Sequence, residues 1–143
     1  TNWGANLIIG THPHVVQNSQ WIKLKNGKKA FCIYSLGNFA NGQVKPDNLI
    51  GAVYRCHFKV RFYPNGKKSV SILEPKLHPY VTVYGSGHSD IHVEWLKDYT
   101  PKEALSHGVR SSNSSFNYNF ICDVLKKNIS SRYLVMPKRR RKK

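Results

Sequence analysis

The sequence predicts a mostly antiparallel β structure with one or two short helices towards the C-terminal end. Residues 54–62 alternate apolar and basic side chains with a period of two, as a strand with one buried face does. Asn-Gly pairs at 26–27 and 65–66 stand between apolar runs, a pattern typical of hairpin turns. Residues 100–103, Thr-Pro-Lys-Glu, have the spacing of a helix capping box with proline at the first helical position.

The first expected strand is the apolar run from Asn6 to Gly10, which we interpret as short and buried. The sequence His12-Pro13-His14 follows it directly, and loops at strand ends often carry the chemistry of a protein. Proline disfavours the helical region for the residue before it. We therefore expect the two imidazole rings to project from a stiff, extended backbone.

Two interpretations of His12 and His14 follow from their residue types alone. Neutral imidazole is the commonest nitrogen ligand of divalent metals, so the pair is a candidate half of a metal site. The alternative is two solvent-facing or hydrogen-bonded histidines, because a short motif has a false-positive risk. The first acidic residue of the chain is Asp47, so no nearby carboxylate completes a ligand shell.

The remaining strands follow from the same patterns, with turns or loops between them. The expected strands cover residues 20–24, 30–34, 54–62, 69–73 and 77–84. Pro75 and Pro79 predict that the last of these is an edge or irregular strand. Short helices are expected over residues 100–107 and 116–128.

The charge of the chain is strongly positive, with 23 Lys and Arg against 7 Asp and Glu among 143 residues, a formal net charge of +16. Such a surface attracts polyanions. Arg55, Lys59 and Arg61 share one face of an expected strand and are the candidate polyanion-binding residues, which makes a basic β-module for nucleic acid one hypothesis. Against it, Tyr54, Phe58 and Phe62 fall on the opposite face and are expected in the core.

The three cysteines, Cys32, Cys56 and Cys122, are widely spaced and odd in number. Cys32 and Cys56 lie in expected strands and are interpreted as small core residues. The chain contains no run of eighteen apolar residues, so no membrane span is expected. The abrupt start on a strand predicts that the chain is the later part of something longer.

Several of these pieces together resemble a known family. Residues 4–17, which contain His12-Pro13-His14, the hairpin around Asn26-Gly27 and the sequence 34–39, Tyr-Ser-Leu-Gly-Asn-Phe, resemble the C-terminal part of the CapA family of capsule and poly-γ-glutamate synthesis, within the calcineurin-like metallophosphoesterase superfamily. The resemblance implies an α/β fold, a four-layer sandwich, of which this chain holds only the C-terminal, mostly antiparallel β portion. We expect residues 1–84 to belong to that domain, residues 85–136 to form an extension with short helices, and residues 137–143 to form a basic disordered tail.

The resemblance also implies site residues. His12 and His14 match a Gly-His-x-His type motif whose histidines are ligands at a centre of two divalent metal ions. Asn38 matches a residue near that centre and is expected to support the ligands. Such a centre binds phosphate and lowers the pKa of a bridging water.

The function implied is that of a CapA-like capsule or poly-γ-glutamate synthesis protein at the cell envelope or extracellular face of a bacterial membrane. Its implied partners are an acidic surface polymer or a phosphate-containing substrate, other capsule-synthesis membrane proteins, and the missing N-terminal part of its own domain. The family's further ligands, aspartates, an Asn-His pair and another His, are not in these residues, and even a catalytic zinc uses three protein ligands. The family implies a phosphoesterase-like hydrolase. Because the further ligands are missing, we predict that this chain alone is inactive.

Overall fold

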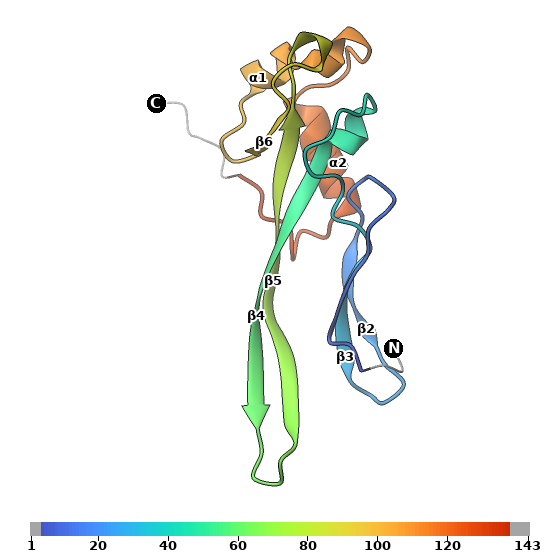
Figure 1. Ribbon diagram of the computed structural model, residues 1–143, viewed down its shortest axis with the longest axis vertical. Coiled ribbons are helices and arrows are strands. Elements are labelled where there is room, and N and C mark those ends of the chain that lie inside the picture. Colours follow the sequence, from blue (N-terminus) through green and yellow to red (C-terminus); the bar gives the residue numbers. More distant parts are fainter. Residues whose placement is uncertain (1–3, 138–143) are drawn as a thin grey trace.

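The computed structural model describes residues 4–137, which form two three-stranded sheets with short helices (Figure 1). The first sheet contains β1 (Leu7–Ile9), β2 (Ser19–Lys23) and β3 (Lys29–Ile33), with β3 in the middle, parallel to β1 and antiparallel to β2. The second contains β4 (Ile50–Phe62), β5 (Lys68–Val83) and β6 (His92–Trp95), antiparallel with β5 in the middle. The helices are α1 (Pro101–Ser106) and α2 (Tyr118–Asn128), and 3-10 turns lie at Pro46–Leu49, Ser86–His88 and Gly108–Ser111. The expected antiparallel β structure with short helices is confirmed, with one parallel strand pair.

One hydrophobic core joins the two sheets. Phe31 of β3 is fully buried and stacks on Tyr54 of β4, with ring centroids 5.7 Å apart. The ring of Phe31 also meets Trp21 and Tyr133 edge to face. Aromatic pairs in these arrangements add to the free energy of burial. Phe31 and its aromatic neighbours therefore form one of the contacts that hold the first sheet to the second.

The helical part of the chain contributes to the same core. The capping box at Thr100 and Glu103 is confirmed, since each side chain bonds the backbone N–H of the other residue. α2 begins after an Asn117 cap and buries Ile121 and Leu125. Buried members of the shared cluster from this part of the chain are Leu96, Tyr99, Ala104, Val109, Phe116, Ile121, Leu125, Ile129, Tyr133 and Leu134. Of the expected tail 137–143, residues 138–143 lie outside the described residues.

Residues 77–84 were expected to form an edge or irregular strand. The edge position is wrong, because β5 continues through both prolines and is the central strand of its sheet, while an irregularity lies just before residue 77, at Pro75. Pro75 lies beside Glu74, at a register shift where two β5 residues oppose Cys56. A bulge of this kind is a usual place for proline in a sheet. The carbonyl of Pro79 accepts from Leu96 N–H at 3.0 Å and so points away from β4. Because the nitrogen and carbonyl of one residue point to the same side in an antiparallel strand, the Pro79 nitrogen also faces away from β4, and the β4–β5 ladder loses no hydrogen bond.

The turn end of β4 and β5, residues 57–73, forms an arm that extends beyond the rest of the molecule (Figure 1). The apolar face of this arm was expected in the core, and that expectation is wrong beyond Cys56. Phe58 is 56% exposed and Phe62 is 77% exposed. The alternation of residue types is as the sequence indicates. Beyond the inner part of that face, where Ile72 is buried, no element of residues 4–137 covers it, and Val60 is also exposed.

Both Asn-Gly turns form, with the same backbone geometry. Leu24 N–H donates to Lys28 O at 2.8 Å and Tyr63 N–H donates to Lys67 O at 2.9 Å. Only the glycines, Gly27 and Gly66, have a positive φ, of 78° and 77°. Each turn is therefore a three-residue loop closed by a left-handed glycine, and not a two-residue turn.

β1 is less buried than expected. Leu7 and Ile8 are half-buried and Ile9 is 48% exposed. Within residues 4–137, β1 pairs with β3 alone, so its other edge carries no partner strand. β1 is therefore an edge strand and is less enclosed than β3, the central strand of the same sheet.

Candidate functional site

The loop that carries the two histidines leaves the end of β1 and is fixed at one end to the last residue of β3 and at the other to the chain that follows β3. Gly10 N–H donates to Ile33 O at 2.7 Å, and Gln17 N–H donates to Ser35 O at 3.0 Å. Between these points the backbone is not extended as expected: φ is 95° at His12 and 62° at His14. His12 therefore departs from the extended conformation that a following proline favours. Positive φ in non-glycine residues costs free energy and occurs most at functional sites.

The structure brings His14 and Asn38 together. Nδ1 of His14 lies 2.7 Å from Oδ1 of Asn38. The amide nitrogen of Asn38 points the other way, donating to Gln43 Oε1 at 3.1 Å and to Asn48 O at 3.4 Å. Because Oδ1 can only accept, Nδ1 of His14 carries the hydrogen. The lone pair of a neutral His14 is therefore on Nε2, away from Asn38.

Asn38 belongs to a cluster of amide side chains in the loop between the two sheets. Asn48 donates to Gln43 Oε1, and Asn41 donates to Asn48 O at 3.1 Å and to Thr82 Oγ1 at 3.3 Å. This cluster fixes which way the Asn38 amide faces. Gln43 and Asn48 were not singled out from the sequence, although four amide residues between positions 38 and 48 were a signal for such a network.

The backbone of Asn38 is also held in place. Tyr80 OH donates to Asn38 O at 2.8 Å, and burial raises the pKa of Tyr80 to about 12, which keeps the phenol protonated. Gly37 has φ of 76°, and a Cβ there would lie 2.6 Å from Ile50 O. Glycine is therefore required at position 37, and Asn38 has little freedom to move.

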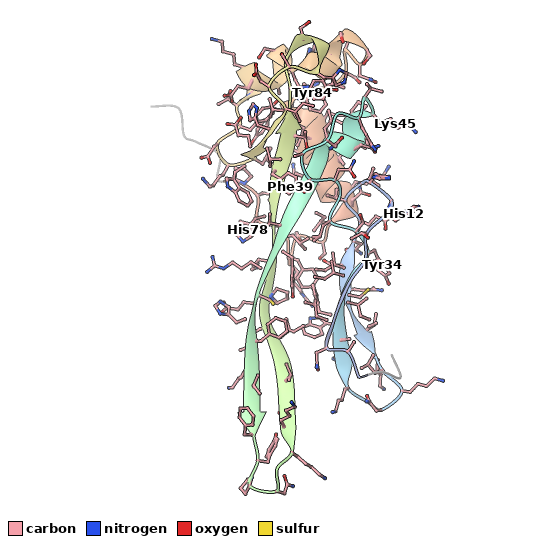
Figure 2. All side chains as sticks on the ribbon, in the orientation of Figure 1. His12, Tyr34, Phe39, Lys45, His78 and Tyr84 are labelled. Atoms are coloured by element: carbon pink, nitrogen blue, oxygen red, sulfur yellow. The ribbon has the colours of Figure 1, made fainter. Side chains whose placement is uncertain are left out.

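His12 lies at the surface beside His14, with ring centroids 6.0 Å apart. Figure 2 shows it on the opposite side of the view from His78 of β5. In residues 4–137 no group of three or more His, Cys, Asp or Glu side chains is placed to hold a metal ion. Two imidazoles fit half of a metal centre, and the described residues do not supply the rest.

The three predicted polyanion-binding residues are all exposed along β4. Lys59 and Arg61 lie on the arm, whereas Arg55 lies before the register shift, opposite Lys76 of β5. Arg55 and Lys76 line an open cavity of about 660 Å³ together with Arg132. The other residues lining it are Trp21, His57, Glu74, Pro75, His78 and Tyr133. Arg132 could not be associated with Arg55 from the sequence, because the two are far apart in the chain.

Cys32 and Cys56 were expected to be small core residues, and this is confirmed fully for Cys32 and partly for Cys56. Cys32 is buried in β3, and Cys56 packs against the core while half-exposed. All three cysteines are free. No helix of residues 4–137 is long and apolar enough to cross a membrane.

Comparison with known proteins gives one match. The model of a family described as bacterial capsule synthesis protein PGA_cap matches residues 1–43. This range holds His12, His14 and Asn38, and it ends before the second sheet begins. No curated protein and no solved structure matches the chain.

Proposed function

We propose that this chain is a CapA-like capsule or poly-γ-glutamate synthesis protein in which the loop at His12 and His14 supplies two ligands to a divalent-metal centre. The match of residues 1–43 to the capsule synthesis family model supports the family. The hydrogen bond between His14 and Asn38 carries the metal proposal. In a metal-ligating histidine, a hydrogen bond made by the ring nitrogen that does not bind the metal fixes the tautomer.

The remaining ligands come, in this proposal, from a part of the family's α/β sandwich that residues 4–137 do not include. The free edge of β1 supports this, since its half-exposed Leu7 and Ile8 offer an apolar surface for a further strand. The loop at His12 follows that strand directly, so ligands on an added neighbour would lie near it. A completed centre of this type supplies a Lewis acid for a phosphate-containing substrate.

An acidic surface polymer is the proposed partner, at the bacterial cell envelope, together with other capsule-synthesis membrane proteins. The net charge of +16 supports an acidic partner. Nucleic acid is the second candidate partner, and the positive charge is the observation that favours it. Binding of short poly-glutamate that exceeds binding of single-stranded DNA at equal salt separates these two.

Metal titration of the 143-residue chain tests the ligand assignment. We expect detectable Mn²⁺ or Zn²⁺ binding by calorimetry that H12A/H14A abolishes, because both imidazoles are removed. The variant N38A should lower the affinity about tenfold, the usual cost of losing a hydrogen bond to a ligand. The matched control is H88A/H92A, which removes two exposed histidines elsewhere and should leave binding unchanged. Metal retained by H12A/H14A would show the assignment to be wrong.

Phosphate ester hydrolysis tests the need for further ligands. We expect no turnover of a simple aryl phosphate by the chain alone, with or without added metal. The reason is that two imidazoles leave a divalent ion short of the three protein ligands of a catalytic site. Hydrolysis that a chelator abolishes would contradict this expectation.

A further inference from the structure

The arm, residues 57–73, is an amphipathic hairpin with an uncovered apolar face. Phe58, Val60 and Phe62 lie on one face of β4, and opposite them on β5 are Ile72, Val70 and, at the turn end, Lys68. Phe62, at the turn end, is the most exposed of the large hydrophobic residues of the described chain. Contiguous exposed apolar surface of this kind marks an interaction site.

The first sheet covers only the inner part of this face. A cavity of about 540 Å³ separates β5 residues, among them Val70 and Ile72, from residues of the first sheet, among them Trp21 and Leu24. Ile72 is buried there, whereas Phe58 and Phe62 lie beyond the part of the face that the first sheet covers and are exposed. Figure 1 shows the arm passing the end of the β2–β3 hairpin.

The rest of the arm is basic. No Asp or Glu occurs from Arg55 to Leu73. The arm itself carries four exposed cations, Lys59, Arg61, Lys67 and Lys68. Lys59 and Arg61 alternate with the apolar residues and so lie on the opposite face of the same strand. None of the four forms an ion pair within residues 4–137.

We propose that the arm docks on an anionic lipid surface. An amphipathic element with a cationic face lies in the membrane interface, its apolar side chains at the acyl boundary and its cations at the phosphates. Charge complementarity decides among occupants: a second copy of this chain brings the same positive charge, and a soluble polyanion leaves Phe58 and Phe62 in water. This inference is independent of the metal centre.

Sedimentation with lipid vesicles tests the proposal. We expect the chain to bind phosphatidylglycerol vesicles at low salt, to bind phosphatidylcholine vesicles at least tenfold more weakly, and to release as salt rises. The variant F58S/F62S should bind phosphatidylglycerol vesicles at least about tenfold more weakly, since each phenylalanine loses its burial. The variant K59Q/R61Q should lose about thirtyfold, because each charge near the surface contributes about fivefold.

The matched control is K126Q/K127Q, which removes two exposed neighbouring lysines from α2 and should change binding less than about threefold. All variants alter exposed residues, so unchanged circular dichroism is expected and shows that folding is intact. Vesicle binding that F58S/F62S leaves unchanged would overturn the proposal, since charge alone would then explain it. A dimer in solution that the same variant disrupts, or single-stranded DNA binding that depends on Phe58 and Phe62, would also overturn it.

Discussion

The two hairpins of this protein share one turn and have opposite surroundings. Both turns contain Asn-Gly-Lys-Lys, at residues 26–29 and 65–68. In both, the Asn side chain accepts from the backbone N–H of the first lysine at 3.1 Å. Yet Leu24 is buried at the first turn, whereas Tyr63 is exposed at the second. Turn geometry is therefore set by a few neighbouring residues, and burial is set by what packs against the hairpin.

The largest expected contrast is between the phenylalanines of the two hairpins. Phe31→Ala should lower the free energy of unfolding by about 3–5 kcal/mol, because it leaves a cavity among Trp21, Tyr54 and Tyr133. Phe62→Ala should change it by no more than about 0.5 kcal/mol, as at other exposed positions. Urea denaturation followed by fluorescence measures both, and similar losses for the two variants would break the comparison.

A smaller and equal effect is expected at the two turn glycines. Gly27→Ala and Gly66→Ala should each cost about 1 kcal/mol, since alanine resists the left-handed conformation and a Cβ meets no atom within 4 Å at either position. Thermal unfolding of the two variants measures this. A loss confined to Gly27→Ala would show that the arm opens separately from the body of the protein.

The smallest expected effect concerns a buried histidine, His107. His107 is buried, with Nε2 2.9 Å from Thr82 O and Nδ1 accepting from Val109 N–H, so both nitrogens are satisfied by the neutral ring. Burial lowers the pKa of His107. The unfolded chain therefore binds the proton first, and stability should fall as pH drops below about 6.5.

The variant His107→Gln separates this effect from general acid unfolding. It should flatten the dependence of unfolding free energy on pH between about 7 and 5, because the titrating group is gone. Equal slopes for the protein and His107→Gln would contradict the assignment.

The sequence predicted most elements and missed their surroundings. Local patterns were sufficient for β4, for the Thr100 cap and for both turns, because propensity and side-chain bonds act over a few residues. The positions of Phe58 and Phe62 in solvent could not be predicted, since alternation indicates a face and does not say what covers it. Pro79 in a central strand was missed for a similar reason: which side its nitrogen faces depends on β6 and Leu96, which come later in the chain.

The residues of the candidate site were likewise predicted in part and missed in part. His12, His14 and Asn38 were singled out from motif spacing and family resemblance, and the structure places His14 against Asn38. The amides that orient Asn38 were missed, because Gln43 and Asn48 belong to a loop with no regular period. The register shift opposite Cys56 was also missed, because an extra residue in β5 leaves the alternation of β4 unchanged.

The last described segment has a consequence for how the protein is made. Leu77 donates its N–H to Tyr133 O and accepts from Val135 N–H, both at 2.9 Å, so the middle of β5 is closed by residues near the C-terminal end. A ribosome delivers residue 77 well before residue 135. Until then β5 has an open stretch of backbone that other chains can pair with. Synthesis of residues 133–135, more than formation of either hairpin, therefore closes this stretch of β5 and ends its exposure to aggregation.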